Sequence, residues 1–152
     1  TVRLLFVCTG NTCRSPMAAG LAGPILAARL GCRPSELRAR GVVVQSAGTS
    51  GRGGGASAHA LEVMAKRGID LSDHFSAALS EEMVQQADYI FAMTHAHRET
   101  ILRMAASAEP KVMLMLEDED VRDPMGSEVE EYEHCAQTIE RGLRARLQEV
   151  IV

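Results

Sequence analysis

The segment at residues 4–16 joins an apolar run to a helix start through a short loop. The run at residues 4–7 is continuous rather than alternating, which predicts a strand buried on both faces. Ser15 and Pro16 predict the start of a helix, because serine is a good N-cap and proline a good first helical residue. A buried strand that leads directly into a helix is typical of parallel α/β sheets.

The loop between this strand and this helix has the composition of an anion-binding site. Gly10 and Asn11 are the residue types that best tolerate positive φ, and a loop of that shape turns successive backbone N–H groups inward. Cys8 ends the strand, and Arg14 lies six positions later at the mouth of the helix. The positive field favours a thiolate, and the arginine fork matches two phosphate oxygens. We therefore expect a phosphate cradle with a nucleophile; the alternative for Cys8 is a small buried apolar residue.

Strands and helices alternate along the rest of the chain. Further strands are expected at residues 42–47, 89–93 and 111–116. This alternation predicts a single α/β domain over residues 1–152, with a four-stranded parallel sheet and helices on both faces in three layers. Helices are expected at residues 15–31 with a kink or break at Pro24, at 56–67, from Ser80, from Thr94, and at 129–150.

Composition limits the partners of the chain. A formal net charge of −4 argues against nucleic-acid binding, and no apolar run approaches the length of a membrane span. The four cysteines have no C-x-x-C spacing, so we expect free thiols in a cytoplasmic protein. The histidines have no metal-ligand pattern, so we expect no metal and no cofactor. The sequence does not give the oligomeric state, and a monomer is expected. The first residue is Thr rather than Met, from which we expect either a processed form or an excised domain of a longer chain. The cysteines are Cys8, Cys13, Cys32 and Cys135.

A proton donor for a departing group is expected in the acidic loop at residues 117–123. Ligands of parallel sheets bind at the carboxyl ends of the strands, where this loop, Ser46 and Thr94 are expected to meet the Cys8 loop. Asp123 differs from the other acids because Pro124 restricts its backbone and helps to orient its carboxyl group. Asp123 is therefore the predicted general acid, with Asp120 as the alternative.

The motif at residues 7–18 (Val-Cys-Thr-Gly-Asn-Thr-Cys-Arg-Ser-Pro-Met-Ala) resembles the low-molecular-weight protein tyrosine phosphatases, and closest are their protein arginine phosphatase members. The resemblance extends through residues 46–49, 92–94 and 123–124. It implies phosphorylated protein substrates, a cysteinyl-phosphate intermediate, no metal, and Cys8, Arg14 and Asp123 as catalytic residues. The phosphate-binding loop that it implies is Thr9, Gly10, Asn11, Thr12, Cys13, Arg14 and Ser15.

The resemblance also implies roles for residues around the loop. Asn11, Ser46 and His59 are similar to the family's network that holds the loop in its left-handed turn. The hydroxyl of Ser15 either caps the helix or donates to the Cys8 sulfur. Cys13 is either a partner of Cys8 in a reversible disulfide or a buried bystander.

Two positions bear on the substrate. Thr12 stands where tyrosine phosphatases of this family usually have Ile or Leu, and where its arginine phosphatases are similar to this sequence. Met125 and Gly126 follow the Asp-Pro pair where tyrosine phosphatases carry aromatic residues, although the arginine phosphatases often have Phe after the Pro. We predict a phosphoarginine phosphatase, with a tyrosine phosphatase as the alternative.

Two further functional classes remain open from the sequence. Arsenate reductases reuse this loop but need a relay cysteine, and neither Cys32 nor Cys135 is well placed for that role. A non-catalytic phosphate-binding module would need the cradle and Arg14, but neither Cys8 nor Asp123.

Overall fold

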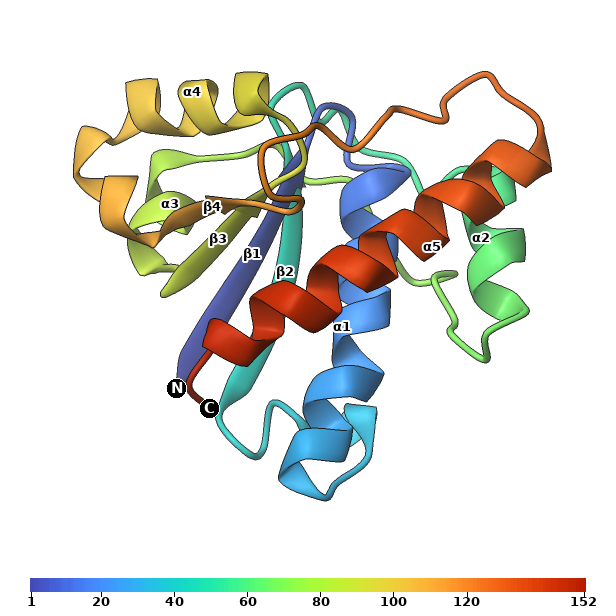
Figure 1. Cartoon of the computed structure of the whole chain (residues 1–152), viewed down its shortest axis with the longest axis horizontal. Helices are drawn as coiled ribbons and strands as arrows, with labels where there is room; N and C mark the ends of the chain where they lie inside the picture. Colours follow the sequence, from blue (N-terminus) through green and yellow to red (C-terminus); the bar gives the residue numbers. More distant parts are fainter.

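The strands form one parallel sheet, as the sequence predicts. The computed structural model describes residues 1–152. The sheet has the order β2-β1-β3-β4, and the loops at its carboxyl edge gather at the top of Figure 1. The strands are β1 (Val2–Cys8), β2 (Val42–Gly48), β3 (Tyr89–Ala92) and β4 (Val112–Leu114).

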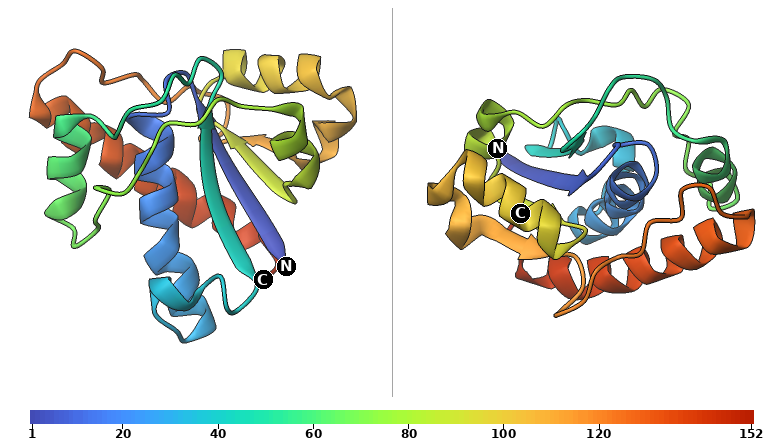
Figure 2. Two further views of the ribbon diagram at one scale, coloured as in Figure 1. Left: turned by 180° about the vertical axis from the view of Figure 1, so that it is seen from behind. Right: turned by 90° about the horizontal axis from the view of Figure 1, so that it is seen from above.

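Helices cover both faces of the sheet and make three layers. On one face lie α1 (Arg14–Leu30), α2 (Ala58–Ala65) and α5 (Val129–Arg146). On the other face lie α3 (Glu81–Gln86) and α4 (His95–Met104), and the view from above in Figure 2 shows the sheet between the two layers. Short 3-10 helices span Pro34–Glu36, Ala106–Lys111 and Leu147–Glu149.

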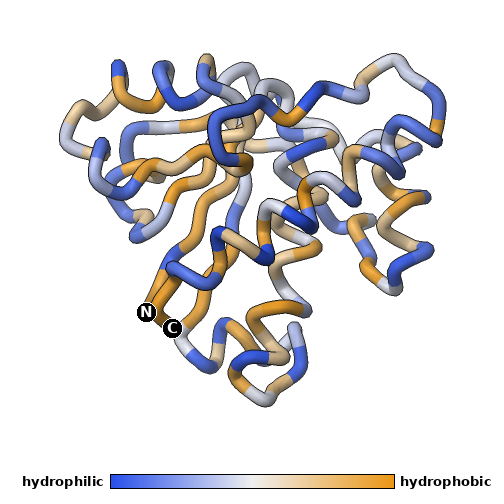
Figure 3. The backbone as a smooth tube through the Cα atoms, viewed as in Figure 1, coloured by the Kyte–Doolittle hydropathy of each residue, from blue (hydrophilic) through white to orange (hydrophobic).

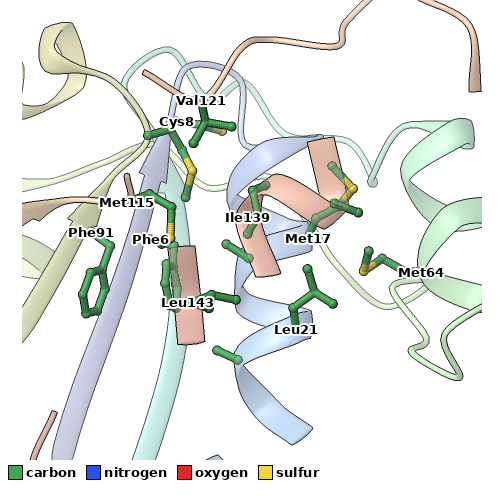
Figure 4. Close-up of a cluster of buried hydrophobic side chains, with 14 of the residues drawn as sticks. Phe6, Cys8, Met17, Leu21, Met64, Phe91, Met115, Val121, Ile139 and Leu143 are labelled. Carbon is green, nitrogen blue, oxygen red and sulfur yellow. The ribbon is translucent and has the colours of Figure 1, made fainter. Parts of the chain in front are cut away.

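The strand β1 supplies side chains to both cores. Leu4 and Phe6 face the larger cluster beneath α1 and α5, while Leu5 and Val7 face the smaller cluster beneath α3 and α4. Figure 3 shows this strand as an almost continuous apolar segment, and Figure 4 shows Phe6 among the side chains of the larger cluster. All five residues from 4 to 8 are buried, so β1 is fixed from both sides and its end is a rigid base for the loop that follows.

The first helix differs from its prediction in the role of Ser15 and in its course at Pro24. It begins at Arg14 with Cys13 as the N-cap residue, so Ser15 lies inside the first turn and the N-cap prediction is wrong. The helix also continues through Pro24 to Leu30, so no break occurs there. Leu21 and Leu26 are buried on either side of the proline, and this packing offsets the missing hydrogen bond. Gly31 ends the helix with φ of 67°, as expected.

Other differences are confined to the ends of elements. The fourth strand stops at Leu114 and α5 stops at Arg146, each shorter than the apolar pattern indicates. Ser80 and Thr94 cap their helices as predicted, each accepting a hydrogen bond from a backbone N–H in the first turn. None of the helices combines the length and the apolarity that crossing a bilayer requires.

The helix α5 approaches the end of β4 closely at Gly142. A Cβ atom at this position would lie 2.7 Å from the carbonyl oxygen of Met115. That distance is shorter than a van der Waals contact, so only glycine lets the helix backbone sit against this turn.

We expect Gly142→Ala to lower the free energy of unfolding by about 1–3 kcal/mol, because the added methyl group must displace backbone atoms. Urea denaturation measures this change. The exposed residue Gln137 on the same helix provides the control, since Gln137→Ala should change stability by less than about 0.5 kcal/mol. Equal stability of Gly142→Ala and the wild type would contradict the close approach.

Candidate active site

The loop after β1 turns its carbonyl groups outward and its N–H groups inward. The carbonyl oxygens of residues 8–12 all accept hydrogen bonds from segments outside the loop. None of the backbone N–H groups of residues 9–13 donates a hydrogen bond within the protein. The loop is therefore a concave set of free donors at a helix N-terminus, which is an anion-binding geometry. The carbonyls of Cys8 and Thr9 accept from the N–H groups of Thr49 and Ser50 at 2.9 and 2.8 Å. The carbonyl of Gly10 accepts from the Ser76 hydroxyl at 2.8 Å, and that of Asn11 from the His74 ring at 2.7 Å. The carbonyl of Thr12 accepts from the N–H of Ser57 at 3.0 Å.

Asn11 fixes the turn of this loop. Its backbone φ of 57° lies in the left-handed region, which asparagine tolerates better than most residues. Its side-chain amide donates to the hydroxyl oxygens of Ser15 and Ser46 at 2.7 and 2.9 Å. Its amide oxygen accepts from the N–H of Ala77 at 2.9 Å. The structure thus brings Asn11 and Ser46 together at the carboxyl edge of the sheet.

His59 lies outside this network, contrary to its prediction. Its ring packs edge-on against Tyr132 with the centroids 5.3 Å apart, and its Nδ1 lies 3.6 Å from a carboxylate oxygen of Glu62. His74 contacts the loop instead, with Nε2 donating to the carbonyl of Asn11. Sequence reasoning missed His74 because the segment around it has neither helical nor strand periodicity. Only the folded chain shows that this segment wraps the loop.

Gly48 allows the second strand to end directly against the loop. A Cβ atom at Gly48 would lie 2.4 Å from the carbonyl oxygen of Thr9 and 3.0 Å from the backbone nitrogen of Asn11. Any larger residue would push the loop away from β2. The hydrogen bonds that the next residues, Thr49 and Ser50, donate to the loop depend on this close approach.

The thiol of Cys8 is buried at the base of the loop. Its Sγ lies 2.9 Å from the hydroxyl of Ser15. Because the Ser15 oxygen accepts a hydrogen bond from Asn11, its own proton is free to point at the sulfur. A hydrogen bond donated to sulfur favours the thiolate, the form of cysteine that acts as a nucleophile.

Arg14 connects the loop to the acidic segment opposite it. Its Nη1 donates to the carbonyl of Val121 at 3.0 Å, and its Nη2 lies 3.4 Å from the Thr9 hydroxyl and 3.5 Å from a carboxylate oxygen of Asp123. The arginine is buried, while the Asp123 side chain is 49% exposed. The predicted nucleophile, arginine and acid therefore meet at one edge of the sheet.

Asp120 has a different environment from Asp123. One oxygen of Asp120 accepts from both the backbone N–H and the ring Nδ1 of His95, each at 2.8 Å. These hydrogen bonds, the backbone one first, lower the pKa of Asp120 and keep it ionised. Asp123 is held more loosely, with one oxygen accepting from the N–H of Met125 at 3.1 Å.

Cys13 faces α5 and the start of α2. Its sulfur lies 3.3 Å from the Ser57 hydroxyl, 3.5 Å from the Tyr132 hydroxyl and 3.7 Å from the Thr12 hydroxyl. Burial raises the pKa of Tyr132 to about 12, so this hydroxyl stays protonated. Cys8 and Cys13 are both free thiols in this structure.

Residues 3–151 match the family described as low molecular weight phosphotyrosine protein phosphatase. The chain belongs to this family. It is 36% identical over 147 residues to a protein-arginine-phosphatase of Bacillus subtilis (strain 168), with 93% of this chain and 91% of the relative covered. The family resemblance read from the sequence is thus confirmed.

Solved structures of the low molecular weight phosphatases match the whole fold. One is a low molecular weight protein tyrosine phosphatase from T. tengcongensis, with a TM-score of 0.84, 34% identity, and coverage of 99% of this chain and 100% of that chain. Another is a cysteine-to-serine mutant of the YwlE arginine phosphatase with a phosphorylated active-site serine, with a TM-score of 0.83, 34% identity and 97% of each chain covered.

The loop network predicts different effects for the two histidines. His74→Ala should lower kcat/KM on a phosphorylated substrate roughly tenfold, because a buried carbonyl of the loop loses its donor. His59→Ala should change kcat/KM less than about threefold, since the ring packs against Tyr132 and makes no hydrogen bond to the loop. Steady-state kinetics of both variants at equal fold stability test this. The reverse ranking would return the supporting role to His59.

Proposed function

We propose that this chain is a cysteine-dependent protein phosphatase that hydrolyses phosphoarginine in protein substrates. Membership of the low molecular weight phosphatase family supports the reaction class. The phosphorylated serine that replaces the nucleophile in the related arginine phosphatase mutant fits phosphoryl transfer to the position of Cys8. The substrate assignment depends on Thr12 in the cradle and on an Asp-Pro pair that is followed in the chain by Met125 and Gly126 rather than by aromatic residues.

The first step transfers the phosphoryl group to sulfur. The free N–H groups of residues 9–13 and the fork of Arg14 bind the phosphate oxygens. The Cys8 thiolate attacks phosphorus, a P–S bond forms, and the bond from phosphorus to the leaving nitrogen breaks. The Ser15 hydroxyl, 2.9 Å from the sulfur, holds the thiolate before attack and after its release.

Asp123 is the general acid of this proposal. A protonated Asp123 carboxyl gives its proton to the leaving nitrogen, and its carboxylate then takes a proton from the water that attacks the phosphocysteine. Water replaces sulfur at phosphorus and restores the thiolate. Asp123 faces Arg14 with its side chain 49% exposed, whereas Asp120 is hydrogen-bonded to His95.

The substrate preference rests on the shape of the cradle mouth. Thr12 is half-buried between Asn11 and Cys13, and its hydroxyl adds a polar group where a branched apolar side chain would stand. Met125 follows the Asp-Pro pair with 55% of its surface exposed, and it offers no ring to stack on a phosphotyrosine. A guanidinium leaves as a cation, which the neighbouring carboxylates stabilise. The 36% identical arginine phosphatase supports the same preference.

Arsenate reduction and simple phosphate binding fit the site less well. Burial raises the pKa of Cys135 to about 12, so it remains a thiol that cannot serve as a relay nucleophile. Cys32 lies past the far end of α1, a helix about 25 Å long. A binding module would need neither the Cys8–Ser15 contact nor an acid facing Arg14, and both are present.

We expect Asp123→Asn to lower kcat about 100-fold or more on phosphoarginine peptides, since general acid catalysis supplies that range. Asp120→Asn should cost less than about tenfold, because this carboxylate serves His95. On p-nitrophenyl phosphate, whose leaving oxygen needs little proton donation, the loss in Asp123→Asn should be smaller. A larger loss in Asp120→Asn than in Asp123→Asn would reassign the acid.

The substrate preference is tested by comparing kcat/KM on matched phosphoarginine and phosphotyrosine peptides. We expect higher values on phosphoarginine, and a shift toward phosphotyrosine in Thr12→Ile, by roughly tenfold in the ratio. Cys8→Ser, which should turn over neither peptide, is the control. Faster wild-type turnover of phosphotyrosine would make the chain a tyrosine phosphatase, and an unchanged ratio would remove Thr12 from selectivity.

A further inference from the structure

A buried histidine on α4 is hydrogen-bonded to the phosphate cradle. His97 is 5% exposed, and its Nε2 lies 2.8 Å from the hydroxyl of Thr9, the residue that follows the nucleophile. Its Nδ1 lies 3.0 Å from the hydroxyl of Thr94, the N-cap of the helix. The same Thr9 hydroxyl accepts a hydrogen bond from Nη2 of Arg14. His97, Thr9 and Arg14 thus form one chain of hydrogen bonds that ends in the phosphate-binding arginine.

One arrangement of protons lets Thr9 serve both Arg14 and His97. Arginine can only donate, so a lone pair of Thr9 faces Arg14 and the Thr9 proton needs another acceptor. Nε2 of His97 is that acceptor when it carries no proton. The ring proton then sits on Nδ1 and is donated to the Thr94 oxygen, which also accepts from the His97 backbone N–H at 3.2 Å. In the other tautomer Nε2–H and Arg14 would both donate to the Thr9 oxygen, and Thr94 would donate to Nδ1.

Burial, together with the charge of Arg14, keeps the His97 ring neutral. Burial, followed by the charge of Arg14, lowers the pKa of His97 to about 4, against weaker opposing effects of Asp120 and Asp123. His95 on the same helix is bonded to Asp120 rather than to His97. At neutral pH the ring therefore adds no positive charge beside Arg14 and leaves one ring nitrogen free to accept a hydrogen bond.

We propose that His97 is a positioning residue for catalysis, which as the neutral Nδ1–H tautomer turns the Thr9 hydroxyl so that its oxygen receives Arg14. This role rests on the proposed function, because it matters only if Arg14 binds a phosphoryl group. The two other partners of Arg14, the Val121 carbonyl and the Asp123 carboxylate, belong to the acidic loop. Thr9 is the partner that belongs to the cradle, so its hydroxyl aligns the guanidinium with the Cys8 sulfur.

Four variants test this role: His97→Leu, His97→Gln, Thr9→Val, and the double variant of His97→Leu with Thr9→Val. Readouts are kcat/KM on p-nitrophenyl phosphate, the inhibition constant of vanadate, and the melting temperature. His97→Leu should lower kcat/KM and weaken vanadate inhibition about tenfold, since one buried hydrogen bond is worth about that factor. His97→Gln, whose amide oxygen can accept from Thr9, should regain most of the loss.

The double variant separates positioning from general destabilisation. If both residues act through the same hydrogen bond, it should lose no more activity than the worse single variant. Multiplied losses, or losses that follow the melting temperature while vanadate inhibition stays unchanged, would overturn the proposal. Glu99→Gln, an exposed change on the same helix, is the control for α4 and should match the wild type.

The tautomer provides a readout that is independent of turnover. Two-dimensional ¹H–¹⁵N NMR of the histidine rings should show His97 protonated on Nδ1 and bare at Nε2 at neutral pH. A proton on Nε2 would overturn the proposal. If the wild type hydrolyses no phosphate ester, the proposed function fails, whereas an active wild type with an unaffected His97→Leu variant removes only this inference.

Discussion

The hydrogen bonds that hold the carbonyl groups of residues 8–12 outward are the constraint on which the site depends. If these oxygens turned inward, the loop would present negative dipoles to a phosphate instead of N–H donors. A loop without regular secondary structure cannot satisfy its own backbone, so the partners must come from elsewhere. They come from the connections after β2 and before α3, which wrap the loop from behind. Two segments that look like simple connectors are therefore part of the phosphate site.

The ionisable groups around the loop differ in their partners and in their charge. Arg14 is buried and reaches both the loop and the acidic segment, while the Cys8 sulfur lies 2.9 Å from the Ser15 hydroxyl. Asp120 is held by His95 and stays ionised, which leaves Asp123 as the acid that faces the arginine. The buried His97 ring is neutral and adds no competing cation. The proposed reaction, which binds a dianion and moves a proton, needs this separation of fixed charge from exchangeable protons.

Local sequence patterns predicted the helices and strands more completely than they predicted the contacts within the site. The continuous apolar run of β1, the glycine after α1 and the caps Ser80 and Thr94 are local signals, and each has the predicted outcome. Ser15 has the sequence of an N-cap, but its hydroxyl is bonded to Cys8 and Asn11 instead. The family resemblance assigned the loop-supporting role to His59, which lies in the first turn of α2 and packs against Tyr132. His74, which has no local pattern, contacts the loop instead.

The sequence by itself determined that a strand, a cysteine loop and a helix follow one another, because burial periodicity, glycine and asparagine conformations and helix propensity are properties of neighbouring residues. It also determined which chemical groups are available, among them the thiol, the arginine and the Asp-Pro pair. Only the tertiary structure decided which distant groups satisfy the loop carbonyls, which aspartate faces Arg14 and which histidine touches Thr9. Those choices depend on how the sheet brings separate strand ends together. Hydrogen bonds and an ion pair between residues 25 to 109 positions apart leave no periodic signal in the chain.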